Sequence, residues 1–166
     1  MKEPTSTVEM KTLIIGMGNP ILADDGVGIR VAQEVKEAIK LISIQEISVI
    51  EASVGGLRLA ELMVDQDRAI IIDAMTSKAA VQPGTIRRLS IEDLAAMSPH
   101  HTASTHDTTL SVALEMGKHM GLRLPKEIVI FAIETEEIRE FSETLTPAVE
   151  RAVPLAVDAV LQEIFA

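Results

Sequence analysis

The chain contains short apolar segments that alternate with longer amphipathic ones. The short segments are rich in Ile and Val, which is typical of buried β-strands. They cover residues 12–16, 47–52, 69–74, 84–90 and 127–133. Residues 69–74 and 127–133 are almost continuously apolar, as in strands of a sheet that is covered on both faces. Residues 84–90 are more polar and follow a Pro-Gly turn, which predicts an edge strand.

The amphipathic segments between these strands have a helical period. They predict helices over residues 26–40, 55–64 and 108–121. The first has an apolar face formed by Val27, Val31, Val35 and Ala38. A last helix is predicted to begin with Thr146 as its N-cap and Pro147 in its first turn. Pro154 lies inside this helix, and we expect a kink or a break there.

Strands that alternate with helices predict βαβ units and hence a mostly parallel sheet. We therefore expect an α/β fold: a three-layer α/β/α sandwich with about five strands. Residues 12–166 are predicted to form a single domain, and the polar residues 1–11 a flexible N-terminal tail. The core must be aliphatic, since 47% of the residues are hydrophobic but only 2% are aromatic.

Charge and cysteine content exclude several classes of function. The formal net charge of −10 argues against a nucleic-acid partner, which requires clustered Lys and Arg. The sequence has no cysteine, so disulfides, thiolate metal sites and a cysteine nucleophile are excluded. No apolar run approaches the roughly 20 residues that span a bilayer. We expect a cytoplasmic protein with no nucleic-acid and no membrane partner.

The segment "LIIGMGNPILADDGVG", residues 13–28, has glycines at the end of a strand, as phosphate-binding loops do. A dinucleotide-binding loop needs a third glycine where this chain has Ile21. Pro20 removes a backbone N–H, and two adjacent carboxylates precede the helix. Nucleotide binding is therefore disfavoured, and the loop has the charge of a cation site.

Ligand sites of open α/β sheets lie beyond the carboxyl ends of the strands. Polar residues at these predicted ends are Asn19, Asp24, Asp25, Ser53, Asp73 and Glu134, and residues 97–107 add His100, His101 and His106. Each also has an ordinary structural explanation. Either aspartate of the first loop can cap the next helix, Asp73 can bind a loop amide, and His106 can be a solvated loop residue.

Together, Asp25, Asp73 and His106 make a stronger case than each alone. His106 precedes Asp107 and Thr108, the predicted cap and start of the helix 108–121, whose N-terminus favours a neutral imidazole that can bind a metal. Two carboxylates and an imidazole suit Ni, Zn, Mn or Fe and leave positions open for water or substrate. We expect Asp25 to face the metal and Asp24 to be a cap or a supporting partner.

Several segments of the chain resemble one protein family, in the family's order. They are "GMGNPILADDGVGIRV", "GGLRLAEL", "IIIDAM", "STHD" and the C-terminal block "IETEEIREFSETLTPAVERAVPLAV". On these motifs the chain resembles the [NiFe] hydrogenase maturation endopeptidases. The resemblance covers nearly the whole chain, from residue 13 to about residue 161. It departs from the family's pattern where many members have Glu instead of Asp25, and where a proline often replaces Thr135.

The resemblance implies a nickel-dependent endopeptidase that removes the C-terminal extension of a [NiFe] hydrogenase large-subunit precursor. It carries the family's metal-recognising residues over to Asp25, Asp73 and His106, which are then also the catalytic candidates. The Ni²⁺ would be presented by the substrate rather than permanently bound. Either the metal or Asp73 as a base would activate water. The alternatives are a resident-metal hydrolase of a small amide or ester, and a non-cleaving chaperone of the immature large subunit.

Overall fold

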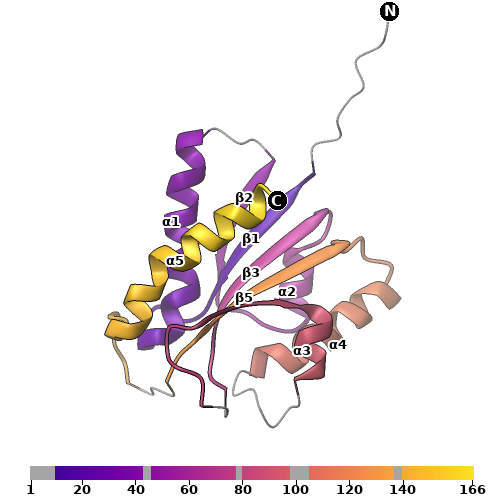
Figure 1. Ribbon diagram of the computed structural model, residues 1–166. Coiled ribbons are helices and arrows are strands. Elements are labelled where there is room, and N and C mark those ends of the chain that lie inside the picture. Colours follow the sequence, from indigo (N-terminus) through magenta and orange to yellow (C-terminus); the bar gives the residue numbers. More distant parts are fainter. Residues whose placement is uncertain (1–9, 43–45, 78–79, 98–104, 137–139) are drawn as a thin grey trace, which may run out of the picture.

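The computed structural model describes residues 10–42, 46–77, 80–97, 105–136 and 140–166. The predicted tail lies largely outside them. Five strands and their helices follow one another along the chain (Figure 1). The strands are β1 (Thr12–Met17), β2 (Ile47–Ala52), β3 (Arg68–Met75), β4 (Ile86–Ser90) and β5 (Glu127–Glu134). The helices are the 3₁₀-helix η1 (Ala23–Gly26), α1 (Val27–Ile42), α2 (Leu57–Leu62), α3 (Ile91–Ala96), α4 (Thr105–His119) and α5 (Pro147–Ile164).

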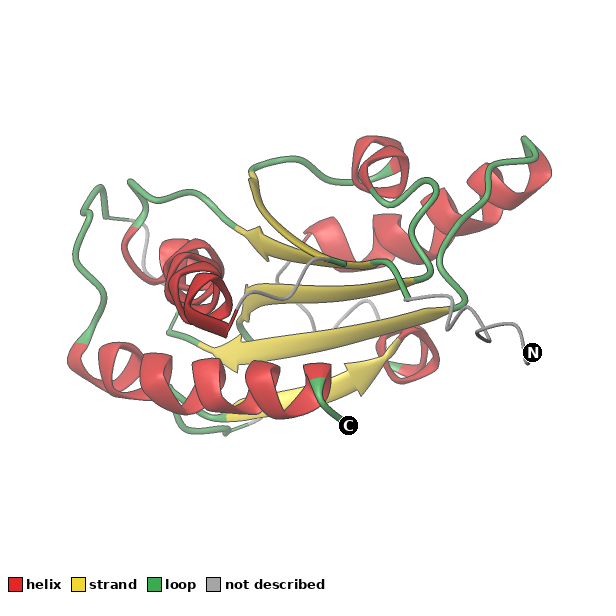
Figure 2. Cartoon of the chain, turned by 90° about the horizontal axis from the view of Figure 1, so that it is seen from above, coloured by secondary structure: helices red, strands yellow, loops and turns green. Residues whose placement is uncertain are grey.

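The strands form a single sheet in the order β2-β1-β3-β5-β4. The first four in this order are parallel, and β4 pairs antiparallel with β5 at the edge. Helices cover both faces of the sheet (Figure 2). The predicted three-layer α/β/α fold, its strand number and its polar edge strand are confirmed.

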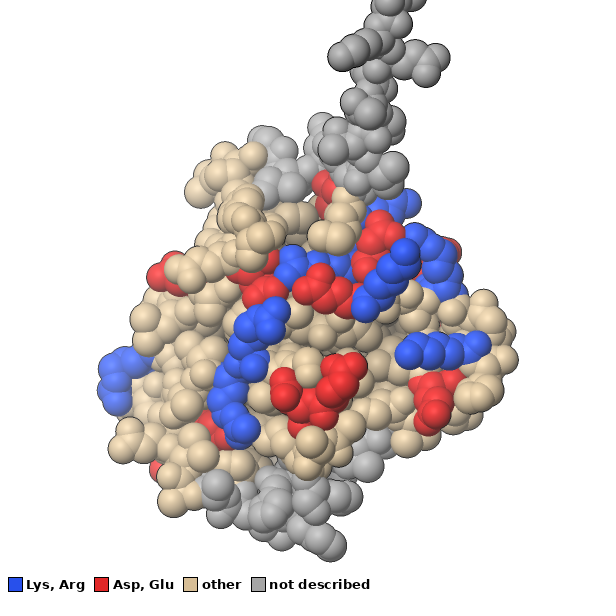
Figure 3. All heavy atoms as spheres, turned by 45° about the vertical axis from the view of Figure 1, so that its right-hand side comes forward, with Lys and Arg blue, Asp and Glu red and all other residues tan. Residues whose placement is uncertain are grey.

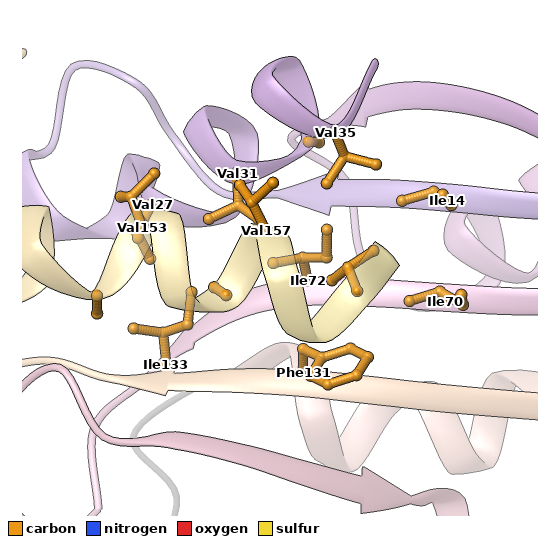
Figure 4. Packing of buried hydrophobic residues seen from close by; sticks show 14 of the residues in the cluster. Ile14, Val27, Val31, Val35, Ile70, Ile72, Phe131, Ile133, Val153 and Val157 are labelled. Atoms are coloured by element: carbon orange, nitrogen blue, oxygen red, sulfur yellow. The ribbon is translucent and has the colours of Figure 1, made fainter. Parts of the chain in front are cut away.

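Each face of the sheet has its own aliphatic core. On one face, α1 and α5 pack against alternate residues of the central strands, among them Ile14, Ile70 and Phe131 (Figure 4). On the other face, α2, α3 and α4 pack against the intervening residues, such as Ile15, Ile71 and Ile130. Because side chains alternate along a strand, the register fixes which polar end residues face which helices.

The helices differ from the predictions in three places. Helix α3 was not predicted; Ser90 caps it, and Asp93 closes a capping box with Ser90. Helix α4 begins at Thr105, three residues before the predicted start. Helix α5 runs through Pro154 without a break. Of the expected kink or break, the break is wrong, because Pro154 is exposed while Ala152, Val153, Ala156 and Val157 hold the helix on the sheet. Within the described residues, no helix combines the length and apolarity that crossing a bilayer requires.

Candidate active site

Glycines bring the loop after β1 and the start of α1 close to the sheet. A Cβ on Gly28 would lie 2.3 Å from the carbonyl oxygen of Ile72 and 2.4 Å from that of Met17. Gly18 has φ +133° and lies against the backbone of Asp25, whose carbonyl oxygen would be 1.8 Å from a Cβ on Gly18. These glycines therefore allow close packing between backbones. They hold the acidic loop against the carboxyl ends of β1 and β3.

Asp24 is buried, with 2% of its surface exposed, and it binds the start of the last helix. Its Oδ1 accepts a hydrogen bond from the backbone N–H of Thr146 at 2.7 Å, and its Oδ2 accepts one from the Thr146 hydroxyl at 2.8 Å. Thr146 is the N-cap residue of α5, as predicted, but its side chain makes no capping bond within α5. Asp24 therefore supports the site loop by linking it to α5.

Asp25 is exposed, in contrast to its neighbour. Its Oδ2 accepts a hydrogen bond from the backbone N–H of Asn19 at 2.8 Å, which fixes the carboxylate relative to the loop. Its other oxygen has no hydrogen-bond partner among the described residues. This oxygen is available to a ligand at the edge of the sheet.

Asp73 is nearly buried at 9% exposure, as expected for a carboxylate that follows three isoleucines. Its neighbours Ile71 and Met75 belong to the core under α2, α3 and α4, so the alternation of the strand directs Asp73 to that face. Its Oδ1 accepts a hydrogen bond from the N–H of Ala74 at 2.9 Å. This hydrogen bond to a backbone amide is the kind of structural contact that was the alternative explanation for Asp73.

His106 lies in the first turn of α4 and not in a loop before the helix, which corrects the predicted helix start. Its side chain lies outside the described part of the structure, as do His100 and His101. His106 is four positions before Leu110, which packs in the core on the Asp73 side of the sheet. Helix α4 ends shortly before β5 begins, so its first turn lies toward the carboxyl ends of the strands (Figure 1).

The described structure brings two of the three predicted residues to the same edge. Strands β1 and β3 are neighbours, with Gly16 opposite Ile72, and η1 contacts β3. The loop that carries Asp25 therefore lies beside the strand that carries Asp73. Within the described residues, which leave out the His106 side chain, no group of three His, Asp or Glu has metal-binding spacing.

Glu134 is a buried carboxylate at the same edge, which the sequence marked only by its position at a strand end. It is 2% exposed and forms an ion pair with Arg87 on β4, with 3.2 Å between Oε1 and Nη1. Its Oε2 accepts a hydrogen bond from the N–H of Ser77 at 3.2 Å. Glu134 thus holds the segment that follows β3. In the sequence, the basic residue Arg87 in the polar edge strand was the signal that could have revealed this ion pair.

The larger of the two described cavities lies away from this edge. It has about 610 Å³ and is lined by residues of α4 from Ser111 to His119 and by the start of β5. A smaller cavity of about 170 Å³ adjoins the acidic loop and is lined partly by Pro20, Ala23 and Gly26. Since a protein substrate is bound over a surface, cavity size alone does not locate the site.

Comparisons with known proteins agree with this architecture. The sequence model of the family HycI, described as hydrogenase maturation protease, matches residues 29–163. The Hydrogenase 2 maturation protease of Escherichia coli is 28% identical over 152 residues, which are 92% of this chain and 89% of that protein. The hydrogenase expression/formation protein HupD of Bradyrhizobium diazoefficiens is 23% identical over 159 residues, 96% of this chain and 80% of that protein.

Solved structures extend the likeness to the whole fold. The hydrogenase maturating endopeptidase HybD from E. coli superposes with a TM-score of 0.75 at 28% identity, covering 93% of this chain and 92% of that one. The [NiFe] hydrogenase maturation protease HybD from Thermococcus kodakarensis gives a TM-score of 0.71 at 25% identity, with 92% and 98% covered. Since the family match spans most of the sequence and these structures share its sheet and helices, the chain belongs to the hydrogenase maturation proteases.

Proposed function

We propose that this protein is a nickel-dependent endopeptidase that removes the C-terminal extension of a [NiFe] hydrogenase large-subunit precursor. The observation that carries the proposal is the pair of carboxylates at one edge of the sheet. Asp25 is exposed with one oxygen that has no hydrogen-bond partner among the described residues, and Asp73 is nearly buried on β3, the strand beside β1. The family provides the reaction class, and this pair provides groups that can recognise a metal and handle a proton.

In this proposal the nickel ion arrives with the substrate. Asp25, Asp73 and His106 would contact it, and carboxylate and imidazole donors suit divalent nickel. A bound metal would polarise the scissile carbonyl or lower the pKa of water. The exposed oxygen of Asp25 fits a ligand that approaches from solvent. Asp73 is held by the strand and the Ala74 N–H, so it can accept a proton from attacking water at a fixed place.

The decisive experiment mixes purified protein with precursor that carries nickel and with the same precursor prepared without it. Mass spectrometry of the large subunit should show loss of a C-terminal peptide only in the nickel-loaded sample. Equal cleavage of both samples would contradict nickel recognition. No cleavage of either, together with a stable complex, would favour the non-cleaving chaperone.

Two further measurements bear on the same proposal. Asp73→Asn should abolish processing, because an amide cannot take a proton and binds metals poorly; full activity would remove Asp73 from the site. Metal analysis of the isolated protein should find less than one ion per chain, and stoichiometric zinc or manganese would favour the resident-metal hydrolase. We place the reaction in the cytoplasm as part of the proposal, with which a cysteine-free sequence is compatible.

A further inference from the structure

The loop that carries Asp25 pairs through its backbone with a segment that is distant in sequence. We call them the site seam, which consists of residues 19–26 and residues 140–146. The N–H of Ser142 donates to the carbonyl of Ile21 at 3.0 Å, and the N–H of Ala23 donates to the carbonyl of Ser142. Leu22 and Ser142 form a parallel bridge, and the bonds between Asp24 and Thr146 close the seam at its end. The seam is therefore a fixed surface of the folded protein.

The seam has two large apolar side chains that are exposed to solvent. Phe141 is 82% exposed, and Ile21 is 47% exposed. The carbonyl of Ile21 accepts the hydrogen bond from Ser142, the residue that follows Phe141. The chain has only three phenylalanines and no other aromatic residue. Exposed single hydrophobic residues are common, but here two lie on hydrogen-bonded neighbouring segments, one of which carries the exposed carboxylate of Asp25.

The cavity of about 170 Å³ lies between the seam and helix α1, and we call it the seam cavity. Its apolar lining includes Ala23 and Ile29 on one side and Leu145 on the other, and Arg30, Gln33 and Glu143 lie at its polar positions. An apolar cavity of about 150 Å³ accommodates a benzene-sized group. The seam cavity therefore has room for one aliphatic or aromatic side chain.

The exposed charged residues of the seam itself are acidic, and Arg30 of α1 is the basic residue that lines the cavity. Glu140 and Glu143 are exposed on one segment of the seam, and Asp25 is exposed on the other. With a net charge of −10 on the whole chain, the surface favours a basic partner over an acidic one.

From these observations we propose that the site seam is the docking subsite for the protein substrate. It takes one apolar side chain of the substrate between Ile21, Phe141 and the cavity, while basic residues next to that side chain lie against the seam glutamates. This inference rests on the proposed function for the identity of the substrate. It adds which kinds of substrate residue are recognised and which residues of this chain recognise them.

The test compares serine substitutions at exposed hydrophobic residues. The variants are Phe141→Ser, Ile21→Ser and the double variant. The matched controls are Phe165→Ser at the end of α5 and Leu41→Ser at the end of α1, which are 62% and 87% exposed in the parent chain. Thermal melts check that all variants fold, as expected because none of these side chains is in the core.

Processing is measured as a function of the concentration of nickel-loaded precursor, and precursor binding is measured in parallel by calorimetry. The double variant should raise KM and weaken binding about tenfold or more, since burial of one large apolar side chain is lost. Its kcat should stay near that of the parent, because only binding common to ground state and transition state is removed. Controls should match the parent in both measurements.

A second comparison tests the charge component. Glu143→Lys should weaken precursor binding severalfold at low salt and less so at high salt. Asp158→Lys, which changes the net charge equally on the exposed side of α5, should have little effect. Seam variants that bind and process like their controls would overturn the docking subsite. Failure of the parent to cleave would instead count against the proposed function, and the binding data would still decide on the subsite.

Discussion

Asp24 and Asp25 are adjacent and chemically identical, yet the fold gives them opposite surroundings. Asp24 is buried and uses both carboxylate oxygens on Thr146, whereas Asp25 is exposed and uses one on Asn19. The difference arises because η1 turns successive side chains to different sides of the loop. We therefore expect Asp24 to contribute mainly to stability and Asp25 mainly to activity.

Amide substitutions should separate these two roles. Asp24→Asn should lower the free energy of unfolding by about 1–3 kcal/mol, because an amide can accept from only one of the two Thr146 donors. Asp25→Asn should change it by less than about 1 kcal/mol, as for an exposed side chain, and should abolish processing. Denaturant unfolding and precursor cleavage check both. The opposite pattern, with Asp25→Asn unstable and Asp24→Asn stable but inactive, would contradict these assignments.

At the scale of elements, the site depends on how closely α1 meets the sheet. The start of α1 lies directly on the carboxyl ends of β1 and β3, and glycine is the residue that permits this approach. The motif glycines therefore fix the distance between the acidic loop and Asp73. Their resemblance to a phosphate-binding loop reflects a shared need for close backbone contact.

Gly28→Ala should be strongly destabilising, although alanine is the better helix former by about 1 kcal/mol. The added Cβ would meet two backbone oxygens at 2.3 and 2.4 Å, and backbone atoms cannot move aside without shifting α1. We expect a loss of more than about 3 kcal/mol in thermal or denaturant unfolding.

Gly121→Ala is the matched control, because a Cβ there meets nothing within 4 Å and only the φ of +77° opposes it. Its cost should stay near 1 kcal/mol. Equal stabilities of the two variants would show that the contact of α1 with the sheet is looser than described.

At the scale of the whole molecule, the end opposite the candidate site is held by charges. Arg68 at the start of β3 is almost buried and pairs with Glu163 in the last turn of α5 and with Glu127 on β5. Arg88 on β4 also binds Glu163, at 2.7 Å between Nε and Oε2. Figure 3 shows basic and acidic side chains next to one another in the upper half of one face. This network ties α5 to three strands, while Asp24 ties its other end to the site.

The network makes a prediction about acid stability. Hydrogen bonds from Arg88, together with the charges of Arg88 and Arg68, hold the pKa of Glu163 below its ordinary value of 4.5. A lowered folded-state pKa stabilises the protein above the unfolded value, and this contribution is lost as the pH falls below about 4.5 through the folded value. Glu163→Gln should therefore flatten the decline in stability below that pH.

The same variant should lose about 3 kcal/mol at pH 7, since it leaves the buried Arg68 with a weaker partner. Glu37→Gln is the control, because the ion pair of Glu37 with Lys40 is exposed on both sides and its loss costs less than about 1 kcal/mol. Urea unfolding from pH 3 to pH 7 measures both. Parallel pH profiles of the parent and Glu163→Gln would contradict the role of this carboxylate.

The sequence predicted the layers well because strands buried on both faces leave an unmistakable apolar pattern. It missed α3, since six residues are too few to show a helical period, although Ser90 and Asp93 had the spacing of a cap. It predicted a kink or a break at Pro154, and the break is absent, because local rules contain no information on packing. The site residues were placed by the strand-end rule, but the partner of Asp24 lies 122 residues away, and no local pattern reveals such a contact.

The link between Asp24 and Thr146 also sets the order in which the protein becomes competent. The ribosome adds Thr146 to the chain 122 residues after Asp24, so β1 and β3 can form while the loop still lacks its anchor. A nascent or C-terminally truncated chain would have the aspartates without their fixed arrangement. The loop that carries Asp24 and Asp25 thus reaches its final arrangement only after Thr146 and the start of α5 have been made.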